Sequence, residues 1–112
     1  MSRVTNVILT AHVGPVPADE EIAFINRVLK DHDGGGGGEF KEVTCHAGGY
    51  KRMECRVYLS AFNHADTDLI IRAVQETPWS DREMVQLFVK EQEEEQFRLR
   101  YSGATDSKIS AG

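Results

Sequence analysis

The order of the periodic segments is the feature that most constrains how this chain folds. Apolar residues alternate with polar ones over residues 4–13, 40–47, 51–62 and 84–91, which is the period of a strand with one buried face. After the first and the third of these segments, apolar residues instead recur every three or four positions, as in a helix with one buried stripe. The sequence therefore predicts the order strand, helix, strand, strand, helix, strand.

Two helices are predicted, over residues 18–31 and 65–76. Acidic residues crowd the first turn of the first helix, where the helix dipole favours negative charge. Asn63 is a favourable N-cap for the second helix, and Pro78 stops it. The first helix presents a single apolar stripe, formed by Ala18, Ile22, Ile25 and Leu29.

The second and third strands are expected to form a hairpin with a three-residue loop over residues 48–50. This loop pairs Ala47 with Lys51, whereas a two-residue turn would send the apolar sets of the two strands to opposite faces of the sheet. The side chains expected to face the helices are Val43, Cys45, Ala47, Met53, Cys55, Val57, Leu59 and Ala61.

The simplest topology with this order is the ferredoxin-like βαββαβ fold. It has an antiparallel sheet of strand order 4-1-3-2 with both helices on one face. Alternation over residues 97–101 adds a fifth, C-terminal strand. We expect one α+β domain over residues 1–101, with a flexible glycine loop at 33–39 and a disordered tail at 102–112. Many unrelated functions share this fold, so it implies no activity.

The sequence contains no motif for catalysis, metal binding or a cofactor. The glycine run lacks the Lys-Ser/Thr pair that completes a phosphate-binding loop. Cys45 and His46 are adjacent on a predicted strand, so they point to opposite faces and do not form a nucleophile and its base. The four histidines lack ligand spacing, and Cys45 and Cys55 are expected to be free thiols. We expect no metal and no cofactor, and the pattern favours a non-catalytic protein over an enzyme.

Four residues form a candidate rim for a ligand pocket. In the predicted topology, the loop after the first strand, the hairpin loop and the loop before the fourth strand lie at one end of the sheet. A pocket at this rim would make the chain a small enzyme or a small-molecule-binding protein. The rim residues are His12, His46, Tyr50 and Trp79.

A candidate interface lies on the open face of the sheet, the face opposite the helices. The predicted alternation places an apolar patch there, and such a patch marks a binding surface. The C-terminal segment, a second copy of the chain, or a ligand or nucleic acid could cover it. Residues 51–58 lack the glycines and paired aromatics of an RNA-binding strand, and the net charge of −5 also disfavours nucleic acid. The interface residues are Ile8, Tyr58, Phe62 and Phe88.

These observations predict a non-catalytic module that forms a homodimer or binds a protein partner through its open face. The rim pocket is one alternative, and an acidic inhibitor of a basic protein partner is another. No apolar run is long enough to span a membrane, and no secretory signal is evident. With two free cysteines, this predicts a cytoplasmic protein.

Overall fold

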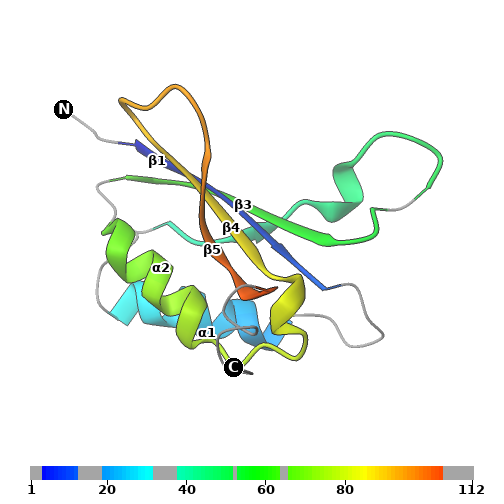
Figure 1. Ribbon diagram of the computed structural model, residues 1–112, viewed down its shortest axis with the longest axis horizontal. Coiled ribbons are helices and arrows are strands. Elements are labelled where there is room, and N and C mark those ends of the chain that lie inside the picture. The colour runs from blue at the N-terminus through cyan, green and yellow to red at the C-terminus, as the bar shows by residue number, and fades with distance from the viewer. Residues whose placement is uncertain (1–3, 13–18, 32–37, 52, 64–65, 105–112) are drawn as a thin grey trace.

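The chain forms a small α+β domain of two helices and a five-stranded antiparallel sheet (Figure 1). The computed structural model describes residues 4–12, 19–31, 38–51, 53–63 and 66–104. The strands lie in the order β2-β3-β1-β4-β5. The elements are β1 (Val4–Ala11), α1 (Asp19–Asp31), β2 (Lys41–Glu42), η1 (Thr44–His46), β3 (Arg56–Asn63), α2 (Thr67–Glu76), η2 (Arg82–Met84), β4 (Gln86–Glu91) and β5 (Arg98–Ser102).

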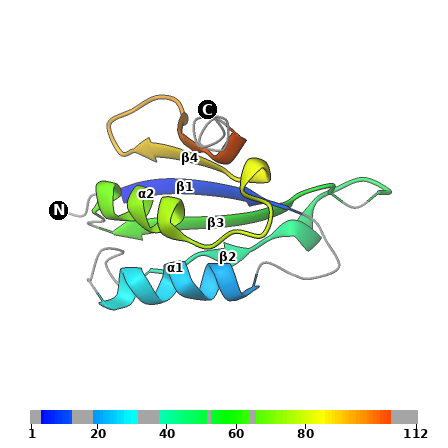
Figure 2. The same ribbon diagram turned by 60° about the horizontal axis from the view of Figure 1, so that its bottom comes forward.

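Both helices cover one face of the sheet (Figure 2). β1 runs between β3 and β4, and its alternate side chains from Thr5 to Ala11 are buried, as the sequence predicts. The two helices bury apolar side chains in the same core as β1, and burial of this kind is the main force that holds the layers together. The helical members of the core are Ile22, Ile25, Leu29, Ile70, Ala73 and Val74.

The predicted orientation of β3 is wrong. Tyr58 and Phe62 were expected on the open face, but they are only 2% and 0% exposed, whereas Leu59 is 40% exposed. The register explains the reversal, because Tyr58 lies opposite the buried Leu9 of β1 and opposite residues share a face. The two aromatic side chains bury more apolar surface in the core than the smaller residues on the other face of the strand would. Phe62 also packs edge-on against Phe40, with ring centroids 5.4 Å apart.

β2 and β3 pair antiparallel as predicted, but the predicted three-residue loop and its register are wrong. β2 contains two residues instead of eight, and Lys41 pairs with Leu59. The backbone N–H of Val43 still donates to the carbonyl of Val57 at 2.9 Å, but the N–H of Val57 donates to Oγ1 of Thr44 at 2.9 Å, so a side chain replaces the return bond of this pair. The chain then turns into η1 where a strand was predicted. We call residues 44–51 and 53–55 the arm; it extends beyond the sheet in Figure 1.

Side chains cap the C-terminal end of α2. The carbonyl of Val74 has no helical donor because the residue four positions later is a proline. The indole Nε1 of Trp79 donates to this carbonyl at 2.8 Å. The guanidinium of Arg82 donates to two further carbonyls at 2.8 Å each, those of Gln75 and Thr77.

β5 extends the sheet beside β4, with a bulge between Leu87 and Phe88. It ends at Ser102, one residue beyond the predicted end of the domain. After it, the backbone N–H of Gly103 donates to the carbonyl of Val85 at 2.9 Å. A Cβ atom at Gly103 would overlap the carbonyl oxygen of Arg82, so the close approach requires glycine. Residues 33–37 of the predicted glycine loop and residues 105–112 of the predicted tail lie outside the described residues.

Candidate functional site

A continuous row of apolar side chains crosses the open face of the sheet. Ile8 lies opposite Leu59 of β3 on one side and opposite Phe88 of β4 on the other. Phe88 in turn lies opposite Leu99 of β5. Side chains opposite each other on adjacent strands are about 5 Å apart at Cβ, so the four are in reach of their neighbours. We call Leu59, Ile8, Phe88 and Leu99 the apolar row.

The ends of the apolar row are the most exposed. Leu59 is 40% and Leu99 51% exposed, while Ile8 and Phe88 in the middle are half-buried. Ile8 and Phe88 were predicted for this face, but Leu59 and Leu99 replace Tyr58 and Phe62 there. The pairing of β3 with β1 decides which face of β3 is open, and the sequence of β3 alone does not reveal this pairing. β5 lies beside β4 in the sheet, so it does not fold back over the row.

Uncharged residues flank most of the apolar row. Thr10 lies on one side of Ile8, next to Val57 and Gln86, and Asn6 lies on the other side, next to Ala61. Among the paired strand positions of this face, the charged residues are two lysines, Lys41 and Lys90, and the exposed Arg100 lies at the bulge of β5. None of these positions holds a carboxylate, although the chain as a whole carries a net charge of −5.

The carboxylates of the strands lie elsewhere. Glu91 of β4 is on the helix side, where its Oε1 accepts hydrogen bonds from the hydroxyls of Thr5 at 2.9 Å and Thr67 at 3.1 Å. Glu42 of β2 pairs with Arg56. The open face is therefore apolar and weakly basic on an acidic protein.

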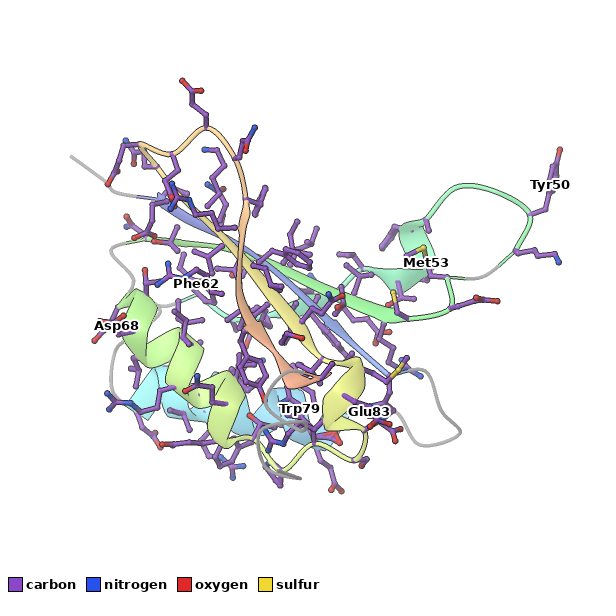
Figure 3. The ribbon with its side chains drawn as sticks, viewed as in Figure 1. Tyr50, Met53, Phe62, Asp68, Trp79 and Glu83 are labelled. Atoms are coloured by element: carbon purple, nitrogen blue, oxygen red, sulfur yellow. The ribbon has the colours of Figure 1, made fainter. Side chains whose placement is uncertain are left out.

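The structure does not bring the four predicted rim residues together. Tyr50 is fully exposed at the end of the arm, whereas Trp79 is buried beside α2, well away from the arm in Figure 3. His46 is exposed on η1. His12 is buried directly after β1, and among the described residues its Nδ1 has no hydrogen-bond partner. The predicted topology placed the loops that carry these residues together at one end of the sheet. In the structure, the length of the arm keeps the residues apart.

A cavity of about 480 Å³ lies at the base of the arm. One side is polar, because Nη1 of Arg56 and Oε2 of Glu42 form an ion pair at 2.7 Å, and Lys51 lines the cavity as well. Nε of Arg56 is buried and has no acceptor among the described residues. Cys45 and Met53 also line it. Of the predicted rim, only Tyr50 belongs to this lining.

A second cavity, of about 450 Å³, lies between α1 and the loop after α2. Glu21 lines it and is buried, and its Oε2 has no partner among the described residues. Glu21 lies in the first turn of α1, where the helix dipole stabilises a carboxylate. Arg27 and Phe24 line the same cavity, so its lining is mixed in charge.

The described residues contain no group of three or more His, Cys, Asp and Glu side chains that could hold a metal ion. Cys45 and Cys55 are free thiols, the first exposed and the second half-buried. No helix within the described segments is long and apolar enough to cross a membrane.

Comparison of the chain with protein-family models, with curated proteins and with solved structures gives no match. The functional argument therefore depends on the geometry of the apolar row and of the cavities.

Proposed function

We propose that this chain is a ferredoxin-like module that self-associates through its open face. The ferredoxin-like assignment is supported by the strand order, because β2-β3-β1-β4 is the order 4-1-3-2 taken from the other edge of the sheet. A helix follows β1 and another follows β3, as that topology requires. β5 is an addition at the edge.

The apolar row is the observation that carries the proposal. It spans four strands, and uncharged residues flank most of it, which is the arrangement of an apolar interface core with a polar surround. In a two-fold dimer the same patch meets its own copy, so the patch must be complementary to itself. A straight row of aliphatic and aromatic side chains meets this condition, since two such rows attract each other in any relative direction. Two sheets in face-to-face contact lie about 10 Å apart, a distance that these side chains span.

The expected affinity follows from the exposed fractions of the two leucines. Full burial of a leucine side chain contributes roughly 1.5–3 kcal/mol, so burying the remaining half of Leu59 and Leu99 contributes about 1 kcal/mol each. Two protomers then gain about 4 kcal/mol from these residues, and the flanking contacts add to this. Association costs at least a similar amount in lost translational and rotational freedom. We therefore expect a weak dimer, with a Kd between about 1 μM and about 1 mM.

Sedimentation velocity over a range of protein concentrations tests the proposal. The wild-type chain should pass from monomer to dimer, whereas Leu59→Lys should remain monomeric at every concentration, because the dimer would bury an unpaired charge. Met84→Lys is the matched control, since Met84 is 47% exposed but lies on η2, outside the row. This control should dimerise as the wild type does. A wild type that stays monomeric up to about 1 mM, or a Leu59→Lys variant that still dimerises, would contradict the proposal.

A further inference from the structure

The cavity at the base of the arm has the features of a binding site that is independent of the apolar row. Lys51 and Arg56 contribute two positive charges to its lining, and Glu42 contributes one negative charge. The described part of the lining thus carries an excess of one positive charge, in a chain whose net charge is −5. A ligand with one negative charge would balance it.

Arg56 presents a donor that no described residue uses. Glu42 accepts from Nη1, but Nε is buried and has no acceptor among the described residues. Buried donors are almost always paired in native proteins, so an unpaired one indicates that an acceptor comes from elsewhere. The Nε and Nη2 atoms form one edge of the planar guanidinium, and this edge matches the two oxygens of a carboxylate.

The remaining lining limits the size and the charge of the ligand. Met53 and Ala47 supply apolar surface next to the polar side of the cavity. The carboxylate of Glu42 is paired to the same guanidinium at 2.7 Å, so it would repel a doubly charged group such as phosphate. The volume of about 480 Å³ is in the range of small-molecule pockets.

We propose that this cavity binds a small organic monocarboxylate. Its carboxylate pairs with the guanidinium of Arg56 and with the ammonium of Lys51, and its apolar body contacts Met53. Tyr50, at the end of the arm, is the aromatic side chain among the described lining residues.

Titration of the protein with benzoate, followed through the backbone amide signals in NMR spectra, tests this site. Benzoate should produce saturable shifts in residues 44–56. Benzamide has the same shape without the charge and should bind about tenfold more weakly or not at all, as expected for the loss of a charge-assisted hydrogen bond. Inorganic phosphate tests the charge limit and should cause smaller shifts than benzoate.

Three variants locate the contacts. Arg56→Lys keeps the charge but lacks the planar edge, so it should weaken benzoate binding severalfold. Lys51→Ala removes an exposed side chain with no described structural contact, and it should weaken binding while leaving the spectrum otherwise unchanged. Lys41→Ala, on β2 outside the cavity, is the control for the loss of one positive charge and should bind benzoate as the wild type does.

The proposal is overturned if about 10 mM benzoate gives no saturable shift, or if benzoate and benzamide bind equally. It is also overturned if Lys51→Ala and Lys41→Ala reduce binding equally, because the effect would then reflect net charge alone. These results do not depend on self-association, since the cavity lining and the apolar row share no residue.

Discussion

Replacement of Phe62 by leucine tests the orientation of β3, on which the composition of the open face depends. The side chain is completely buried, and its ring packs edge-on against Phe40. Phe→Ala in a core costs about 3–5 kcal/mol, and Phe→Leu removes about half as many carbons, which gives roughly 2 kcal/mol. Loss of the aromatic pair adds about 0.5–1.5 kcal/mol. The sum lowers the free energy of unfolding by about 2.5–3.5 kcal/mol, or the Tm by about 10–15 °C.

Phe88→Leu is the matched control, because Phe88 carries the same ring half-buried on the opposite face. It should cost less than about 1 kcal/mol. Urea unfolding of both variants, at a protein concentration low enough to keep them monomeric, measures the two losses. A double-mutant cycle between Phe40 and Phe62 should then give a coupling of about 0.5–1.5 kcal/mol. Equal losses in the two single variants, or no coupling in the cycle, would refute the assignment of Phe62 to the core.

Three further substitutions test local features of the fold. Gly103→Ala forces a methyl group into a backbone carbonyl and should lower the free energy of unfolding by about 1–3 kcal/mol in urea denaturation, whereas Gly48→Ala, in open space, should change it by less than about 1 kcal/mol. Trp79→Phe keeps an aromatic ring but leaves the carbonyl of Val74 without its donor, so calorimetry should show a loss of about 1–3 kcal/mol; an unchanged Tm would contradict this role. Asp66→Ala removes the N-cap that accepts from the first turn of α2 and should cost about 1 kcal/mol, while Asp66→Asn should restore most of it.

The order of helices and strands was predictable because the spacing of apolar residues that marks each element is a local property of the sequence. The two helices, the strand β1 and the C-terminal strand were all expected close to where they lie. β3 was harder, because it has apolar residues on both faces, with Leu59 on one and Tyr58 on the other. Alternation shows that the faces differ, but only the pairing with β1 shows which of them meets the helices.

The candidate sites were less predictable than the fold. The rim residues depended on a short hairpin loop, and the loop became the arm because Thr44 ends the β2–β3 ladder with its side chain. That bond joins residues 13 positions apart, so no local pattern reveals it. The cavity at the base of the arm is also a consequence of the end of the β2–β3 ladder at Thr44. Its key residue, Arg56, pairs with Glu42, 14 positions earlier, and this ion pair is likewise not revealed by any local pattern.

Arg82 links the end of α2 to β5 in the C-terminal part of the chain. Its guanidinium caps α2 and donates to the hydroxyl of Tyr101 at 2.7 Å, and its own carbonyl packs on Gly103. The end of α2, η2 and β5 should therefore open as one cooperative unit in native-state hydrogen exchange, with a common free energy of opening. A chain that ended before β5 would lose an outer strand, and it would also loosen the far end of a helix that precedes that strand by more than twenty residues.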